Sequence, residues 1–329
     1  MIYFIINPLA GGGQGAAAGA KIREVLDPIN FEYTICESEY PGHAVELARE
    51  LSQKADCTGI VAVGGDGTFS EVLNGMDIST PLGLIPCGTG NDFASGAGIS
   101  KDIAAALKAV ISGNTAPMDY ITVGDRRCLN ITGTGFDVDI LIREAKYRKK
   151  LKSKITYYLA LFVTILSIRF RSLKAVIDDN TVIDRDILIL VAANGRFFGG
   201  GMPMVPSAVT NDGVMDVLVV RKVPYIVIPK LLFCFLKGNI EKQTKYVDIY
   251  RCKKISCAVE GSTDIEVDGE VVSLLPAEIR IHSGELACSA RRVYEEKNSR
   301  IGYWSAGNRC MRICGAQNGA QRYNRARKT

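Results

Sequence analysis

The sequence predicts an α/β amino-terminal domain with a mostly parallel open sheet, followed by a mainly antiparallel β-sandwich carboxy-terminal domain. Over residues 1–123, short β-branched runs alternate with helix-like segments, as they do in βαβ units. Beyond about residue 124 this alternation gives way to many short strand-like runs separated by Gly and Asn turns. With 329 residues, 47% of them hydrophobic, the chain is long and apolar enough for two domains of ordinary size.

The first domain is expected to alternate strand with helix along its whole length. The expected strands are residues 2–6, 31–36, 60–63, 82–85 and 118–123, and the expected helices are 16–26, 43–54, a helix beginning at 68, and 101–112. Because the parallel strands of an open α/β sheet end at one edge, the loops that follow them gather there. Asn7 after the first strand and Ser38 after the second are therefore expected at the same edge.

The loop after the third strand, Gly64-Gly65-Asp66-Gly67-Thr68, has the composition of a phosphate-binding turn. Glycines let the backbone turn sharply and bring its N–H groups against a polyanion. Thr68, with Glu71 three residues later, predicts a capping box at the start of the next helix. A carboxylate such as Asp66 repels phosphates unless a divalent cation lies between them, so the loop indicates a site for a nucleotide with Mg²⁺. An ordinary strand-to-helix turn is the competing interpretation.

A second loop of similar design follows the fourth strand. It runs from Pro86 to Ala94 and combines glycines with the hydroxyl of Thr89 and the carboxylate of Asp92. Two such loops at the ends of neighbouring parallel strands would face each other across one crevice. This pairing favours the nucleotide site over the ordinary turn.

The second domain is expected to consist of short strands interrupted by two helical segments. The expected strands are residues 127–132, 174–178, 187–193, 214–220, 246–250, 255–259, 263–267 and 278–282, and the helical segments are 137–170 and 224–237. The second helical segment is apolar on most sides, so we expect it to lie in the core.

The first helical segment overlaps a strongly basic zone. Residues 143–174 hold ten Lys or Arg and one acid, and they include the apolar run Ile155–Ile168. This run is shorter than the 18 or more residues of a membrane-spanning helix. A basic, partly apolar helix could rest on an anionic membrane, whereas the alternative is a core helix with a solvated basic end.

Two turns of the second domain carry acidic residues, and turn chemistry alone would explain both. In Asn211-Asp212-Gly213, Asp212 is flanked by turn carbonyls and could hold a divalent ion. In Asp268-Gly269-Glu270, a tight Asp-Gly turn presents Glu270. Asp119, near the end of the first domain, either joins the acidic residues of the crevice or is an exposed strand-end acid.

The charge of the chain is unevenly distributed. The net charge is +5, and residues 291–329 hold ten Lys or Arg and two Glu. We expect domains at 1–123 and 124–285, a return to the first domain over 286–297, and a basic, flexible tail over 298–329. Local basic zones on an otherwise acidic body favour anionic surfaces or ligands over nucleic acid.

The cysteines and the first residues bear on location. The ten cysteines include no CxxC pair, so we expect reduced thiols, with a zinc site as the alternative. The apolar start is only six residues long before Asn7, too short for a signal-peptide core. The predicted location is the cytoplasm, with peripheral contact to the inner face of the membrane left open.

These motifs occur in an order that resembles the diacylglycerol kinase catalytic-domain family, in particular its soluble bacterial lipid kinases. The resemblance covers about residues 1–290 and rests on several motifs. They are Asn7-Pro8 with its glycines, Gly64 to Gly75, Pro86 to Ala94, Gly133-Thr134-Gly135-Phe136-Asp137, Phe198-Gly199-Gly200-Gly201, Asn211-Asp212-Gly213 and Asp268-Gly269-Glu270. The Gly-Gly-Asp-Gly-Thr element alone is shared with NAD kinases and phosphofructokinases.

The resemblance implies roles for individual residues. ATP would lie between the two domains and be contacted by Asn7, Ser38, Gly64, Gly65, Asp66, Gly67, Thr68, Glu71 and Thr89. Asp66 would help to organise Mg²⁺, and Glu270 matches the general base of the family. A structural Mg²⁺ is implied at Asp212, with backbone carbonyls near Val209 and Val214. Ser38 stands where the family usually has threonine, and it keeps the hydroxyl.

The implied function is an ATP-dependent kinase that phosphorylates a lipid hydroxyl at the membrane surface, most simply converting diacylglycerol to phosphatidic acid. One alternative is a kinase for a sphingoid base or a polyprenol. Another is a membrane-associated nucleotide-binding regulator without turnover. A homodimer and contact with anionic phospholipids are left open.

Overall fold

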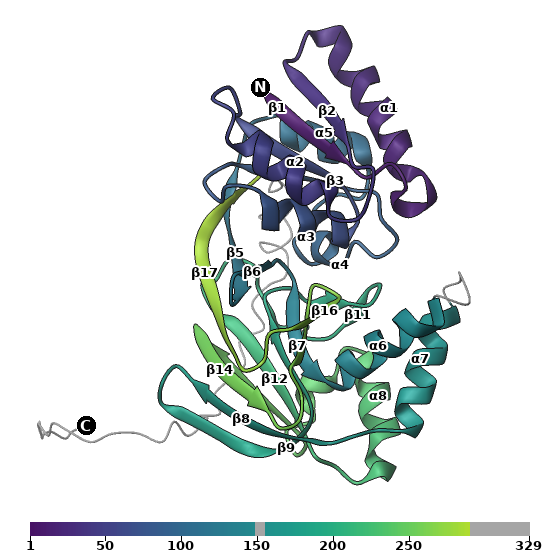
Figure 1. Ribbon diagram of the computed structural model, residues 1–329, viewed down its shortest axis with the longest axis vertical. Helices are drawn as coiled ribbons and strands as arrows, with labels where there is room; N and C mark the ends of the chain where they lie inside the picture. Colours follow the sequence, from purple (N-terminus) through teal and green to yellow (C-terminus); the bar gives the residue numbers. More distant parts are fainter. Residues whose placement is uncertain (149–154, 290–329) are drawn as a thin grey trace, which may run out of the picture.

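The computed structural model describes residues 1–148 and 155–289. The expected tail at 298–329, most of the expected return segment and the middle of the basic zone 143–174 lie outside the described residues. The chain forms two lobes, and in Figure 1 the amino-terminal lobe lies above the carboxy-terminal lobe. Among the described residues, no helix combines the length and the apolarity needed to cross a bilayer.

The sheet of the amino-terminal lobe is parallel, as the sequence predicts. Its strands are β1 (Ile2–Ile6), β2 (Tyr33–Glu37), β3 (Gly59–Gly64) and β4 (Leu82–Pro86), in the order β4-β3-β1-β2. Ile6 pairs with Glu37 on one side and with Val63 on the other. The three strands therefore end in line, and the loops that follow them start from one edge.

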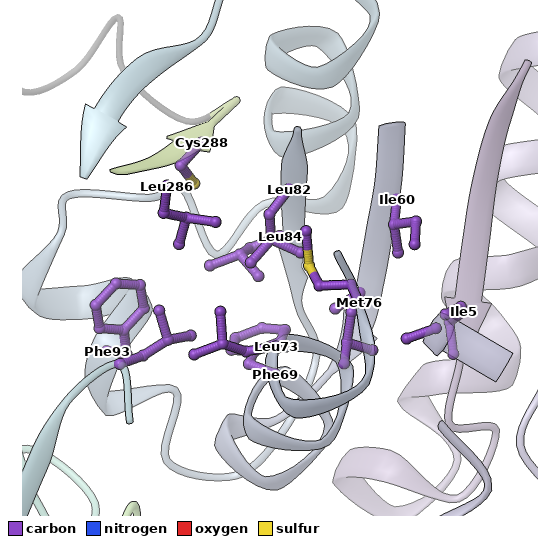
Figure 2. Packing of buried hydrophobic residues seen from close by; sticks show 14 of the residues in the cluster. Ile5, Ile60, Phe69, Leu73, Met76, Leu82, Leu84, Phe93, Leu286 and Cys288 are labelled. Carbon is purple, nitrogen blue, oxygen red and sulfur yellow. The ribbon is translucent and has the colours of Figure 1, made fainter. Parts of the chain in front are cut away.

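Helices cover both faces of this sheet. They are α1 (Gln14–Leu26), α2 (His43–Ser52), α3 (Asp66–Gly75), α4 (Asp92–Gly96) and α5 (Ile103–Ile111). On one face, Phe69 and Leu73 of α3 pack with Leu84 of β4, as Figure 2 shows. On the other, Ile22 of α1 packs with Leu107 of α5. Burial on both faces explains why β3 is apolar at every position.

The carboxy-terminal lobe is an antiparallel β-sandwich. Its principal strands are β7 (Ile131–Gly135), β8 (Arg171–Ile177), β9 (Thr181–Ala193), β12 (Met215–Arg221), β13 (Val247–Cys252), β14 (Lys254–Val259), β15 (Asp264–Val267), β16 (Glu270–Ser273) and β17 (Ala277–Cys288), with the short pair β10 (Phe197–Phe198) and β11 (Met202–Pro203). Alternate residues of β9 serve two cores, since Leu190 lies in the sandwich interior and Val191 lies under the helices.

A group of helices covers one side of this lobe (Figure 1). It consists of α6 (Phe136–Arg148), α7 (Ile155–Leu166) and α8 (Ile228–Leu236), the last preceded by the 3₁₀ turn η3 (Tyr225–Val227). The expectation that 224–237 lies in the core is wrong, because Phe233 is 62% exposed and only Ile228 and Leu231 of α8 are buried.

A two-stranded ribbon joins the lobes. β5 (Ala116–Val123) enters the carboxy-terminal lobe, and β17 pairs antiparallel with it on the way back. The lower part of β17 pairs with β14, and Cys288 at its upper end pairs with Leu82 of β4. Between these parts the pairing with β5 shifts register, from His282 to Leu286, which is a bulge in the ribbon.

The expected strand over 127–132 is two strands, β6 (Arg126–Cys128) and β7. The break has a physical cause that periodicity does not reveal. The buried carboxylate of Asp268 accepts the backbone N–H groups of Leu129 and Asn130, so these donors leave the strand ladder.

Candidate active site

The two glycine-rich loops lie at the ends of adjacent strands, because β3 and β4 pair in parallel. The second loop is closed by Asn91, whose side-chain oxygen accepts the Gly88 N–H at 3.0 Å and whose amide donates to the Gly88 carbonyl at 2.9 Å. The first loop leads into α3, of which Asp66 is the first residue. Both loops therefore deliver helix N-termini, where backbone N–H groups favour anions.

The predicted capping box at Thr68 is wrong. The helix begins two residues earlier than expected, its N-cap is Gly65, and no side chain caps it. Thr68 is the third residue of α3, and its side chain occupies the space that a Cβ on Gly64 would need. Glu71 accepts instead the N–H of Gly42, at 3.2 Å.

Asn7 and Ser38 follow the ends of β1 and β2. Asn7 donates its side-chain amide to the Thr68 hydroxyl at 3.4 Å, so the first and third loops are in contact. The Ser38 N–H donates to the Ile6 carbonyl at 2.8 Å, which places Ser38 beside the end of β1. Asn7, Ser38 and Thr68 thus lie along one edge of the sheet.

A cleft of about 950 Å³ separates the lobes at this edge. Its amino-terminal wall includes Asp66, Thr89 and Asp92. Its opposite wall includes Asn130, Glu144, Arg148, the glycines 199 and 200, and the turn residues Asp268 and Gly269. One cavity therefore joins the first acidic loop to the turn that precedes Glu270.

Asp92 bridges this cleft, a role that the sequence did not single out. Its carboxylate accepts the N–H groups of Gly200, at 2.8 Å, and Gly201, at 2.6 Å, from the other lobe. Burial raises the pKa of Asp92, and the charge of Asp66 adds to this rise, while the two N–H groups oppose it. A glycine-rich run 108 residues away in the sequence gives no local signal of such a contact.

Glu270 is the first residue of β16, after a turn in which both Asp268 (φ 48°) and Gly269 (φ 87°) are left-handed. Val267 and Glu270 pair across this two-residue hairpin loop. The Glu270 carboxylate is partly exposed and forms an ion pair with Arg126 of β6. Glu270 itself does not line the cleft, whereas the two turn residues before it do.

Asp268 fixes the base of this turn, and it was also missed. Its buried carboxylate accepts the N–H groups of Leu129 at 2.8 Å, Asn130 at 2.9 Å and Ile131 at 3.3 Å. Burial raises the pKa of Asp268, and these hydrogen bonds pull it back. An Asp-Gly pair explains a hairpin by itself, so the sequence gave no reason to expect a long-range anchor.

The turn at Asp212 lies apart from the cleft. The Asp212 carboxylate pairs with Arg251 and accepts the Val214 N–H at 3.3 Å. Asp119 is buried rather than exposed, and it accepts the N–H groups of Gly213 at 2.8 Å and Gly284 at 2.7 Å. Among the described residues, no group of three or more His, Cys, Asp or Glu side chains could hold a metal. The Mg²⁺ site at Val209, Asp212 and Val214 stays a prediction.

Buried acids also lie behind the Glu270 turn. Asp137, in the first turn of α6, is 2% exposed, and neither carboxylate oxygen has a donor at hydrogen-bonding geometry. Burial raises the pKa of Asp137 to about 7, opposed in part by the N–H groups of its own helical turn. Glu266 of β15 is fully buried, and burial together with the charge of Asp137 raises its pKa well above the usual value.

The raised pKa of Asp137 predicts a pH-dependent stability. In the unfolded chain an aspartate ionises near pH 4, so raising the pH from 4 to 7 favours the unfolded state. This contribution is complete below pH 4 and lost as the pH passes through about 7. We expect the free energy of unfolding of wild type to fall more steeply over this interval than that of Asp137→Asn. Urea denaturation between pH 4.5 and 7.5 measures both slopes, and parallel curves would contradict the assignment.

Two lobes with this sheet, this sandwich and an acidic cleft between them define a phosphotransferase-type class. The diacylglycerol kinase catalytic domain model matches residues 1–123, and the YegS C-terminal NAD kinase beta sandwich-like domain model matches residues 130–290. The chain belongs to the diacylglycerol kinase catalytic-domain family.

The similar proteins come from Bacillus species. A Bacillus subtilis protein named diacylglycerol kinase is 26% identical over 278 residues, which is 83% of this chain and 91% of the relative. Another B. subtilis relative, YtlR, provisionally named a lipid kinase, is 28% identical over 293 residues, 83% of this chain and 94% of its own length. A crystal structure titled as a Bacillus anthracis diacylglycerol kinase superposes with a TM-score of 0.71 at 26% identity, covering 88% of this chain and 97% of that one.

Proposed function

We propose that this protein transfers the γ-phosphoryl group of ATP to a lipid hydroxyl, most simply that of diacylglycerol, giving phosphatidic acid. The observation that carries this proposal is the single cleft that joins the Asp66 loop of one lobe to the Asp268–Gly269 turn of the other. Membership of the family and the name of the B. subtilis relative support the same reaction. In this proposal residues 1–123 bind the nucleotide and residues 124–285 bind the acceptor.

The donor side of the cleft suits a nucleotide phosphate chain. The N-termini of α3 and α4 would supply backbone N–H groups, with Asn7, Thr68 and Thr89 as polar contacts and Ser38 and Glu71 beside them. The carboxylates of Asp66 and Asp92 line the same wall, and carboxylate oxygen is a preferred donor to Mg²⁺. When bound there, Mg²⁺ would neutralise charge on the phosphates. Asp66 has one oxygen committed to the Phe93 N–H at 3.2 Å, and its other oxygen lies over Gly90.

The acceptor side would provide the base. In phosphoryl transfer the protein chiefly positions the reactants, and a carboxylate near the acceptor hydroxyl can take its proton as the new bond forms. Glu270 is proposed for this role, with Arg126 holding its carboxylate until the acceptor is bound.

An apolar pocket supports a lipid as the acceptor. It has a volume of about 100 Å³ and lies among α6, α7, α8 and the sheet face of β9 and β12. Its walls are aliphatic and aromatic, including Leu161, Leu188 and Phe235, and its one acidic lining residue is Asp137. Such walls fit an acyl chain, whereas a sugar or a nucleoside acceptor would find few polar partners there.

The pocket is bordered by apolar side chains that face outward. Phe162 of α7 is 60% exposed and Ile226 of η3 is 87% exposed, and Phe233 lies beside Lys237. We propose that this border, with nearby basic residues, rests on the surface of an anionic membrane, because lipid acceptors reside there.

We expect the double variant Phe162→Ser/Ile226→Ser to bind anionic vesicles at least about tenfold more weakly than wild type. Burial of one large apolar side chain is worth about 1.5–3 kcal/mol, and 1.4 kcal/mol corresponds to a tenfold change. Flotation with neutral and anionic vesicles measures binding. The matched control is Val182→Ser/Ile29→Ser, which removes exposed apolar side chains away from the pocket. Equal flotation of both variants would exclude this surface.

One assay separates the candidate functions. The protein is incubated with labelled ATP, Mg²⁺ and mixed micelles that contain diacylglycerol, a sphingoid base, a polyprenol or no added lipid. We expect label in phosphatidic acid. Label only on the sphingoid base or the polyprenol would identify a kinase for that lipid. ATP binding without transfer to any of them would identify a nucleotide-binding regulator.

A further inference from the structure

Glu266 has an unusual position for a charged residue. It lies on β15, is 0% exposed, and sits four residues before Glu270 in the hairpin that carries the proposed base. One of its carboxylate oxygens accepts the N–H of Gly269 at 2.8 Å. The other has no hydrogen-bond partner among the described residues.

The surroundings of Glu266 make it costly. Glu266 pairs across the sheet with Gly133 of β7. A Cβ on Gly133 would lie 2.6 Å from a carboxylate oxygen of Asp137, so Asp137 covers the position opposite Glu266. Two buried acids with unsatisfied oxygens therefore lie close together, and an apolar residue at position 266 would be better for stability.

The single hydrogen bond that Glu266 makes lies at the turn. Gly269 is at the second central position of the two-residue loop, next to Glu270, and it lines the cleft. The N–H of Gly269 and the carboxylate of Asp268 are the two ends of this loop, and Asp268 is tied to residues 129–131. With both ends tied, the loop can present Glu270 in one direction only.

We propose that Glu266 is a positioning residue, which holds the Gly269 amide and thereby orients Glu270 toward the acceptor hydroxyl. This inference rests on the proposed function of Glu270. It explains why a buried acid is kept where packing alone would favour an apolar side chain. Glu266 does not line the cleft, so it acts through the turn and not on the substrate.

The test compares Glu266→Met, which keeps length and removes the acceptor, with Glu266→Gln, which keeps an acceptor oxygen. We expect Glu266→Met to lower kcat about tenfold to a hundredfold, because small displacements of a catalytic group have effects of this size. The KM for ATP and the Tm should not worsen, since the nucleotide wall is untouched and a buried acid is removed. Glu266→Gln should restore most of the lost kcat.

Hydrogen exchange at the Gly269 amide gives a readout that needs no turnover. We expect faster exchange in Glu266→Met than in wild type, with slow exchange restored in Glu266→Gln. Wild-type kcat in Glu266→Met, or equal losses of kcat in both variants, would overturn the inference. If wild type phosphorylates no lipid, the proposed function fails, and unchanged exchange in Glu266→Met would still separately refute the hold on the turn.

Discussion

Asp66→Asn is expected to lower kcat by at least about a hundredfold, the scale of losing one preorganised electrostatic group. Asparagine keeps an oxygen for the Phe93 N–H, so the helix start and the second loop should stay in place. What is lost is the negative charge on the wall where the proposed Mg²⁺ and phosphates meet. The loss should be visible in turnover with labelled ATP, while Tm changes little.

The matched control for this variant lies at the other end of the same helix. Asp77 follows α3, is exposed, and accepts the Ser79 N–H at 2.9 Å, a bond that asparagine also keeps. Asp77→Asn should therefore retain wild-type turnover. Normal turnover by Asp66→Asn would remove Asp66 from the proposed mechanism.

Glu270→Gln is expected to show the second large effect, a fall in kcat of about 10²–10⁴-fold, the usual contribution of a general base. Glutamine cannot take the acceptor proton, but it has the same size and stays on an exposed strand. The ion pair with Arg126 is partly exposed, and such pairs contribute about 0–1 kcal/mol, so folding should be unaffected. The KM for ATP should be unchanged, because Glu270 is on the acceptor side.

Glu278→Gln provides the comparison for Glu270. Glu278 is another partly exposed glutamate on a strand, paired with Arg280 at 2.7 Å. Its replacement removes a similar ion pair without touching the cleft. A loss of kcat in Glu278→Gln equal to that in Glu270→Gln would mean that the effect comes from surface charge rather than from proton transfer.

Features that depend on neighbouring residues were predictable from the sequence. The apolar runs of β1, β3 and β4 and the glycines after them predicted the parallel sheet and its two loops, and the structure and the comparisons confirm that fold. The dense short strands after residue 124 predicted the sandwich for the same reason, since alternation and turns are local properties.

Features set by distant contacts were not predictable. Asp92 contacts glycines more than a hundred residues away, and Asp268 contacts an N–H group 139 residues away. The capping box at Thr68 failed because Gly64 has no Cβ, which lets Thr68 pack inside the helix rather than before it. The exposed face of α8 was missed because hydrophobicity alone does not distinguish a core helix from one that faces a lipid surface.

The bulge in β17 constrains how the two walls of the cleft can approach each other. Below it the strand is bonded to β14, and above it the strand reaches β4, so the bulge lies where one lobe ends and the other begins. Asp119 holds Gly284 at this point. A hinge here would let the lobes swing as rigid bodies about the ribbon in Figure 1, and this closing movement could bring Glu270 within reach of a nucleotide on the opposite wall.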